Sequence, residues 1–256
     1  ILLRARVTDA PGCGIAGMDR EQLLERAGGH GVNRVVYRLV RLVFLPFFLT
    51  WFRLDRVGRE HVPAEGPVIF AANHRSFLDP FAISGSSKRP LYFVAKQELF
   101  QKNRLQTWFL NSLGAFPIDR GAGDEDSMAT ARRILERGDG VMIFPEGTRS
   151  PDGRMYRGRT GGMRVALPLG VPVIPVAVIG ARGSGPWWTW GRNGSRRIHV
   201  TYLPPFDLSP WAGREDDPQA WREATEALMA TIREVTGQEY ADRYPTPEEL
   251  HARDNR

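Results

Sequence analysis

Short apolar runs with the length of buried strands recur along this sequence, and segments with helical patterns separate them. The apolar runs lie at residues 67–72, 91–95, 140–144, 173–178 and 198–203. Helical patterns lie at about 80–87, 98–112, 124–138 and 160–169, and an amphipathic helix is expected at 218–236. Strands that alternate with helices predict an α/β domain with a largely parallel sheet flanked by helices.

Composition divides the chain into four parts. Residues 1–32 are polar and Gly-rich, and we expect a flexible N-terminal extension there. Because Met18 opens a stretch that resembles a natural start, residues 1–17 are interpreted as a leader, a tag remnant or an upstream extension. Residues 33–56 are expected to form a basic helical segment, residues 57–238 the α/β domain, and residues 239–256 a C-terminal tail.

The segment at 33–56 combines basic and apolar positions. Arg34, Arg38 and Arg41 recur at helical spacing, and an uncharged run from Leu42 to Phe52 follows them. That run is shorter than the ~20 residues of a spanning helix, whereas a basic, aromatic-rich helix can lie among lipid headgroups. The alternative is a helix packed on the core of the domain. We expect membrane contact, as a peripheral or monotopic protein at the cytoplasmic face of the cell membrane.

The charge and the cysteine content limit the partners. The chain has 35 Lys and Arg residues against 29 Asp and Glu, a formal charge of +6. A basic balance suits anionic lipid, a phosphorylated substrate or nucleic acid, but no nucleic-acid motif is present, so we expect no nucleic-acid partner. The single cysteine, Cys13, forms no disulfide within the chain and supplies too few ligands for a zinc site. We expect a reduced, intracellular protein without a bound metal.

A histidine and an aspartate follow the apolar run at 67–72. His74 and Asp79 stand in Asn73-His74-Arg75-Ser76-Phe77-Leu78-Asp79. In a regular helix they would point about 140° apart, so they meet only in a turn or in the first turn of a helix. Asp79 would then hold one imidazole nitrogen and leave the other as a base. The alternative is an aspartate that caps the helix beside an incidental surface histidine.

Two other segments place charges after strand-like runs. Phe144-Pro145-Glu146-Gly147-Thr148-Arg149-Ser150 offers a glycine, a hydroxyl and a guanidinium suited to phosphate oxygens, although a β-turn at 150–153 with solvated charges is the alternative. Gly114-Ala115-Phe116-Pro117-Ile118-Asp119-Arg120 ends on an arginine that either clamps phosphate or pairs with a nearby aspartate. A further segment, 170–178, has two prolines in an apolar run, which predicts an edge strand or an irregular strand.

In their order along the chain, the four segments resemble the blocks of the glycerolipid acyltransferase family typified by 1-acylglycerol-3-phosphate acyltransferases. The family blocks are Asn-His-x-Ser-x-x-Asp, Gly-x-x-x-Ile-Asp-Arg, Phe-Pro-Glu-Gly-Thr-Arg-Ser and Val-Pro-Val-x-Pro-Val, and the similarity covers about residues 57–205. The chain departs from the family where a Lys-Gly-Ala run is replaced by Arg157-Gly158-Arg159-Thr160-Gly161-Gly162. A Trp cluster at 187–190 is unusual as well, and is either an interfacial anchor or part of a packed lid or core.

The resemblance implies a fold and a reaction. The fold would be a mixed, largely parallel sheet flanked by helices and preceded by a membrane-associating helical segment. A fatty acyl group would pass from acyl-CoA or an acyl-carrier protein to the sn-2 hydroxyl of 1-acylglycerol 3-phosphate, giving phosphatidic acid, without a cofactor. Alternatives are another lysophospholipid or polar glycolipid acceptor, or a non-catalytic membrane-binding protein on the same fold.

The resemblance also implies roles for single residues. His74 would act as the general base and Asp79 would orient it, with no covalent acyl-enzyme. The acceptor site would be lined by Lys96, Arg120, Glu146, Gly147, Thr148 and Arg149.

Overall fold

The computed structural model describes residues 32–96, 103–118, 125–180 and 197–254, together with residue 100 and positions 24, 25, 27 and 29. These residues form a central sheet of seven strands. In spatial order the strands are β1 (Asp55–Val57), β8 (His199–Tyr202), β7 (Val173–Ile179), β2 (Val68–Ala72), β5 (Gly140–Ile143), β3 (Leu91–Lys96) and β4 (Ala115–Ile118). The five strands from β7 to β4 are parallel, whereas β8 is antiparallel to β7 and parallel to β1.

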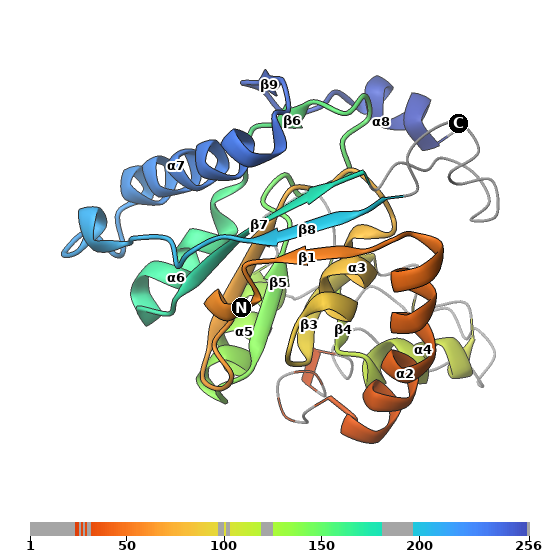
Figure 1. The fold of residues 1–256 in the computed structure, drawn as a ribbon. Helices are drawn as coiled ribbons and strands as arrows, with labels where there is room; N and C mark the ends of the chain where they lie inside the picture. The colour runs from red at the N-terminus through yellow and green to blue at the C-terminus, as the bar shows by residue number, and fades with distance from the viewer. Residues whose placement is uncertain are drawn as a thin grey trace, which may run out of the picture.

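Helices cover both faces of the sheet (Figure 1). On one face lie α2 (Arg34–Trp51), α3 (Asp79–Ser86) and α4 (Arg104–Ser112). On the other lie α5 (Glu125–Glu136), α6 (Met163–Leu169) and α7 (Pro218–Thr236).

Strand β2 shows why the strand sequences are apolar without interruption. Val68, Phe70 and Ala72 belong to the core on the side of α2 and α3. Ile69 and Ala71 belong to the core on the side of α5, α6 and α7. Because successive side chains point to opposite faces, a strand covered by helices on both sides needs an apolar residue at every position.

The predicted α/β architecture with a largely parallel sheet is confirmed. Each of the five apolar runs contains a strand, and each of the five helical patterns contains a helix. Two features of the sheet were not predicted. The short strand β1 lies at one edge, and the last long strand of the chain, β8, runs against its neighbour β7.

The interpretation of 170–178 as an edge or irregular strand is wrong, because β7 lies inside the sheet between β8 and β2. The proline within it, Pro175, is opposite Ala71 of β2, and its carbonyl oxygen accepts a hydrogen bond from the main-chain nitrogen of Leu203 at 2.9 Å. Leu203 comes just after the end of β8. The ladder bond that a proline cannot donate therefore falls where the neighbouring strand has ended.

Both ends of the chain contribute to the packed structure. Leu24 and Ala27 are buried in the core, so the segment expected as a flexible extension supplies at least these two side chains to it. Residues 239–256, expected as a tail, form β9 (Tyr240–Ala241), which pairs with β6 (Met155–Tyr156), and the helix α8 (Pro247–Asp254). Cys13 and the Trp cluster at 187–190 lie outside the described residues.

Helix α2 has a packed face and an exposed face. Tyr37 and Phe48 are buried, and Phe48 packs in the core shared with α3. Val35, Leu39, Leu42 and Val43 recur at helical spacing and are 66%, 58%, 71% and 68% exposed. Among the helices that the structure describes, none is long and apolar enough to cross a membrane.

Candidate functional site

The site lies where β2 and β5 end side by side. The two strands are parallel neighbours, and Ala71 is in register with Ile143. The segment that begins at His74 follows β2, and the segment from Phe144 to Ser150 follows β5. Parallel strands present their carboxyl ends at one edge of a sheet, so two segments about 70 positions apart in the sequence meet here. The main-chain nitrogen of Ser150 donates a hydrogen bond to the carbonyl oxygen of His74 at 2.8 Å.

His74 and Asp79 are paired, as their positions in a turn predict. The Nδ1 atom of His74 lies 2.9 Å from Oδ2 of Asp79, and the side chains are 12% and 1% exposed. An ionised carboxylate only accepts hydrogen bonds, so Nδ1 carries a proton and Nε2 is the atom at which His74 can take up another. The imidazole ring is stacked on the ring of Phe144, with centroids 4.0 Å apart.

The turn between β2 and α3 is built around one oxygen of Asp79. Its Oδ2 atom also accepts hydrogen bonds from the main-chain nitrogens of Arg75 and Ser76, both at 2.7 Å. The Oδ1 atom is buried and has no hydrogen-bond partner among the described residues. The aspartate therefore caps the turn and holds the histidine at the same time, so the two interpretations of this residue are compatible.

Glu146 lies under the site rather than in it. Its side chain is 1% exposed, with Oε1 accepting from the main-chain nitrogen of His74 at 2.9 Å and Oε2 from that of Tyr156 at 3.0 Å. Burial raises the pKa of this carboxyl to about 7, against the lowering effect of the two hydrogen bonds. Both oxygens are used in joining the end of β2 to β6, so Glu146 positions the histidine and does not line the cavity.

Asn73 fixes the end of β2 to β7. Its side chain donates to the carbonyl oxygen of Val178 at 3.0 Å and accepts from the main-chain nitrogen of Val178 at 2.8 Å. The same amide nitrogen donates to Oε1 of Gln238 at 2.8 Å. An asparagine that bonds a main-chain donor and acceptor together extends the pairing of the two strands beyond Ala72.

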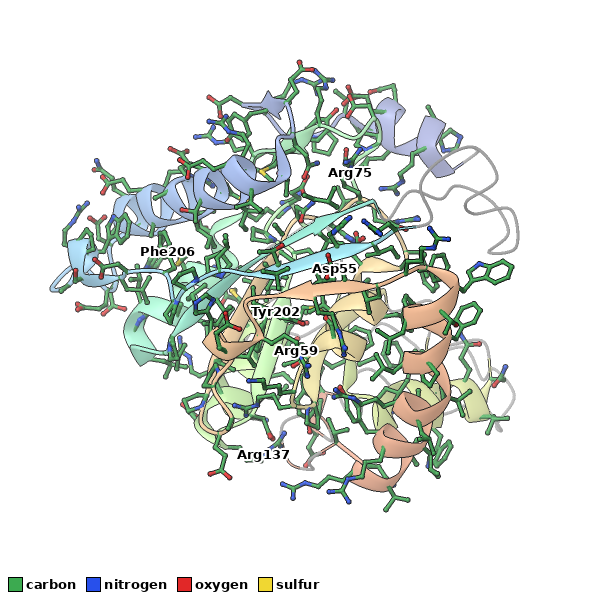
Figure 2. The ribbon with its side chains drawn as sticks, in the orientation of Figure 1. Asp55, Arg59, Arg75, Arg137, Tyr202 and Phe206 are labelled. Carbon is green, nitrogen blue, oxygen red and sulfur yellow. The ribbon has the colours of Figure 1, made fainter. Side chains whose placement is uncertain are left out.

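The C-terminal helix α8 holds the segment after Gly147. Nη1 of Arg253 donates to Oγ1 of Thr148 at 3.0 Å and to the carbonyl oxygen of Arg149 at 2.7 Å. The expected turn at 150–153 is present, with the main-chain nitrogen of Gly153 donating to Oγ of Ser150 at 2.8 Å. Gly153 lies against the side chain of Arg75, since a Cβ added at Gly153 would be 2.8 Å from its Nη2 atom. Figure 2 shows Arg75 between the sheet and the C-terminal part of the chain.

A cavity of about 390 Å³ opens beside His74. This volume lies in the range of pockets that bind small molecules. One group of lining residues is apolar and comes from β3, β5 and α5: Val94, Ala95, Met128, Ala131, Leu135, Val141 and Ile143.

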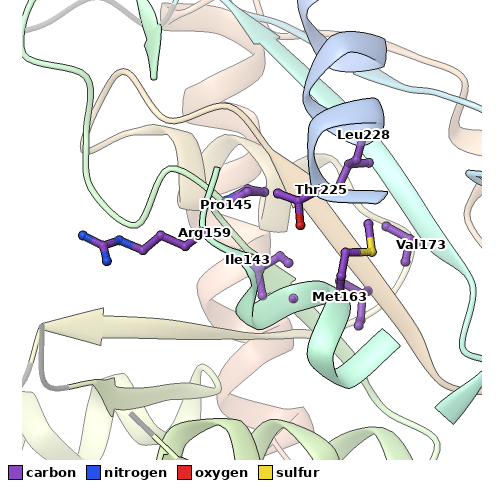
Figure 3. Close-up of a pocket in the computed structure, with 9 residues that line it drawn as sticks. Ile143, Pro145, Arg159, Met163, Val173, Thr225 and Leu228 are labelled. Atoms are coloured by element: carbon purple, nitrogen blue, oxygen red, sulfur yellow. The ribbon is translucent and has the colours of Figure 1, made fainter. Parts of the chain in front are cut away.

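A second group of lining residues is basic or polar. Arg159, Arg164, Arg222 and Tyr244 line the same cavity, and no acidic residue does so in the described parts of the chain. A much smaller cavity, of about 10 Å³, adjoins it (Figure 3). Arg159 lines both, and Figure 3 shows its guanidinium group pointing away from the apolar side chains around the small cavity.

The structure brings together only some of the expected site residues. His74 and Gly147 line the cavity, whereas Glu146 is buried below it and Thr148 and Arg149 are held by Arg253. Arg120 and the side chain of Lys96 lie outside the described residues. The backbone of Lys96 ends β3, at the same edge of the sheet as His74.

Sequence reasoning missed five residues. Arg159, Arg164, Arg222 and Tyr244 line the cavity, and Arg253 holds the segment after Gly147. Arg159 belongs to the stretch that departs from the family pattern while keeping its charge, and that departure was the available signal. No motif marks Arg164 in α6, Arg222 in α7, or Tyr244 and Arg253 in the C-terminal segment.

The buried carboxyl of Glu146 predicts a pH-dependent contribution to stability. Its pKa is raised from 4.5 to about 7, so the folded chain binds more protons than the unfolded chain between these values. The contribution is therefore fully present below pH 4.5 and is lost as the pH rises through 7. Relative to Glu146→Gln, the free energy of unfolding of the unmodified chain should fall by roughly 3 kcal/mol across this range, measured by urea denaturation. A difference that does not change with pH would contradict the raised pKa.

The contacts of Arg253 predict that α8 orders the segment after Gly147. Replacing Arg253 by Gln removes a charged donor from Thr148 and Arg149, so hydrogen exchange of the amides at 147–150 should become about tenfold faster or more. His251→Gln, on the exposed side of the same helix, is the matched control and should leave this exchange unchanged. Equal protection in the two variants would show that α8 does not hold the segment.

Part of this chain is similar to known acyltransferases. Residues 53–179 match the family model described as Acyltransferase. The chain is 30% identical, over 51% of its length, to a chloroplastic 1-acyl-sn-glycerol-3-phosphate acyltransferase of Brassica napus, of which it covers 38%. It is 32% identical, over 57% of its length, to the 1-acyl-sn-glycerol-3-phosphate acyltransferase of Pseudomonas aeruginosa, of which it covers 55%. The chain thus spans less than two thirds of the length of these curated relatives.

A solved structure has the same fold. The crystal structure of the 1-acyl-sn-glycerophosphate (LPA) acyltransferase, PlsC, from Thermotoga maritima superposes with a TM-score of 0.58 at 23% identity, covering 83% of this chain and 86% of the other. Residues 53–179, with the paired His74 and Asp79 inside them, therefore form a domain of the acyltransferase family.

Proposed function

We propose that this protein transfers a fatty acyl group from a thioester donor to the sn-2 hydroxyl of 1-acylglycerol 3-phosphate, giving phosphatidic acid. The observation that carries the proposal is the pair of His74 and Asp79, of which His74 lines a cavity with an apolar group and a basic group of lining residues. Relatives that bear the name 1-acyl-sn-glycerol-3-phosphate acyltransferase support the same acceptor.

The apolar lining residues suit the acyl chain of the donor. Val94, Leu135 and Val141 line the cavity that His74 also lines. Apolar surface that leaves water contributes about 25 cal/mol per Å², so a hydrocarbon chain is stabilised along these side chains. Its thioester carbonyl would then lie near the imidazole, at the end of the cavity where β2 and β5 terminate. Acyl-CoA and an acyl-carrier protein both present such a thioester.

The chemistry needs one base and no protein nucleophile. Nε2 of His74 removes the proton of the acceptor hydroxyl while the oxygen attacks the thioester carbonyl. The new ester C–O bond forms, the C–S bond breaks, and the leaving thiolate takes the proton back from the imidazolium. Asp79, bonded to Nδ1 at 2.9 Å, keeps the ring in the required tautomer and stabilises its positive charge. No covalent acyl-enzyme forms in this scheme.

The exposed face of α2 suits contact with a lipid surface, from which the lysophospholipid acceptor would come. Helix α4 contacts α2 and adds Leu105 and Trp108, which are 73% and 44% exposed. A contiguous set of exposed apolar side chains marks an interaction site, and arginines on α2 add attraction to anionic lipid. We therefore propose peripheral binding to the membrane through these two helices.

Two variants separate the base from its orienting residue. Asp79→Asn can keep all three hydrogen bonds of Oδ2 through its amide oxygen, while it loses the charge and places its NH2 group where Oδ1 has no partner among the described residues. We expect turnover of acyl-CoA with lysophosphatidic acid to fall ~10²–10⁴-fold in this variant and at least as much in His74→Ala. Thermal unfolding and vesicle binding serve as controls and should change little. Substantial activity of His74→Ala would remove the histidine from the mechanism.

The membrane proposal predicts an effect of single charges on α2. Leu42→Asp and Val43→Asp place a carboxylate at side chains that are 71% and 68% exposed. Binding to vesicles that contain anionic lipid, measured by flotation, should weaken about tenfold or more. Each substitution replaces an apolar side chain, which would leave water on binding, by a carboxylate. Val235→Asp, at a 38% exposed position on α7, is the control. Equal flotation of all three variants would place the membrane contact elsewhere.

A further inference from the structure

We infer that Arg159, with its guanidinium over the ring of Tyr244 and Arg222 bonded to the adjoining Gly158, forms the subsite that binds a phosphate group of the substrate. The inference rests on the proposed function and deepens it. It concerns residues outside the four sequence blocks, and two of the three lie beyond the part of the chain that matches the family model.

The guanidinium of Arg159 belongs to the same cavity as the imidazole of His74. The main-chain nitrogen of Arg159 donates to the carbonyl oxygen of Pro145 at 2.7 Å, which fixes the arginine beside the segment after β5. Its side chain crosses Gly147, where an added Cβ would lie only 2.7 Å from Nε. Gly147 has a φ of +70°, so a glycine is favoured there on two grounds.

The charge of Arg159 is not neutralised by an acidic neighbour. Arg157, two residues earlier, pairs with Glu226 at 3.1 Å, and Arg164 pairs with Glu125 at 2.9 Å. Within the described ranges, by contrast, no carboxylate pairs with Arg159, and no acidic residue lines the cavity. A cation at the mouth of a cavity without a counter-charge attracts an anionic ligand.

Arg222 and Tyr244 hold this cation in place. The guanidinium of Arg159 lies over the ring of Tyr244, 5.0 Å from its centroid. Nη1 of Arg222 donates to the carbonyl oxygen of Gly158 at 2.6 Å, and Nη2 donates to the hydroxyl of Tyr244 at 3.1 Å. One side chain of α7 thus fixes both the residue before Arg159 and the ring beneath it.

A phosphate group is the ligand that this arrangement fits. A guanidinium offers parallel N–H donors that match two phosphate oxygens, and contact with an aromatic ring restricts its position before the ligand arrives. The proposed reaction brings phosphate from two sources. One is the glycerol phosphate of the acceptor, and the other is the phosphate groups of the CoA or phosphopantetheine carrier of the donor.

Binding measurements without turnover test the subsite. The probes are a 1-acyl-propanediol 3-phosphate, which keeps the phosphate of the acceptor and lacks the sn-2 hydroxyl, and free CoA. Calorimetric titration of the detergent-solubilised full chain gives a Kd for each. Arg159→Gln should raise the Kd of one probe ~10–100-fold, and the probe affected identifies the source of the phosphate. Arg157→Gln makes the same charge change outside the cavity and should alter neither Kd by more than about twofold.

Two further variants separate the subsite from a general effect of charge. Arg159→Lys keeps the charge and loses the planar pair of donors, so it should bind more weakly than the unmodified chain and more tightly than Arg159→Gln. Tyr244→Leu removes the ring and should raise the same Kd several-fold. The subsite would be overturned if Arg159→Gln and Arg157→Gln had the same Kd values for both probes. It would also be overturned if the unmodified chain bound neither probe. Arg159-dependent binding without any acyl transfer would instead overturn the proposed function and leave the subsite standing.

Discussion

One buried carboxyl group joins the segments that build the site. Glu146 follows β5, yet its two oxygens accept hydrogen bonds from the main-chain nitrogens of His74, beyond β2, and Tyr156, in β6. Burying a carboxyl is costly, and the two donors offset part of that cost only while both segments keep their positions. The location of the imidazole therefore depends on a residue that does not reach the cavity.

The residues of the motif from Asn73 to Asp79 have different structural roles in the turn after β2. Asn73 extends the pairing with β7, and Oδ2 of Asp79 organises two main-chain amides and the imidazole. Of the residues in this motif, only His74 lines the cavity. Most of the motif is thus occupied with holding one nitrogen of one ring, which is what a base that must act on a bound hydroxyl requires.

Much of the fold could be predicted because burial on both faces leaves a direct trace in the sequence, as β2 shows. The direction of β8 leaves no such trace, since apolar content says which residues are buried and not which way a strand runs. For the site, the distance between His74 and Asp79 in the sequence showed that they could meet only in a turn, and it left open whether Asp79 holds the histidine or caps the helix. The position of Glu146 was not predictable, because its partners are main-chain amides, which every residue but proline has. Arg222 and Tyr244 could not be placed, because α7 and the C-terminal segment reach the cavity only through the tertiary fold.

The proposed base and the residues that hold Arg159 lie in different parts of the chain. Residues 53–179, which match the family model, contain the proposed base, the aspartate bonded to it and the apolar lining residues. Arg222, Tyr244 and Arg253 come after this region and contact residues within it: Gly158, Arg159, Thr148 and Arg149. The position of Arg159 is therefore set by contacts between the two regions, whereas the pair of His74 and Asp79 is set within one. Changes in the C-terminal region can then move this cation while the contact between His74 and Asp79 stays the same.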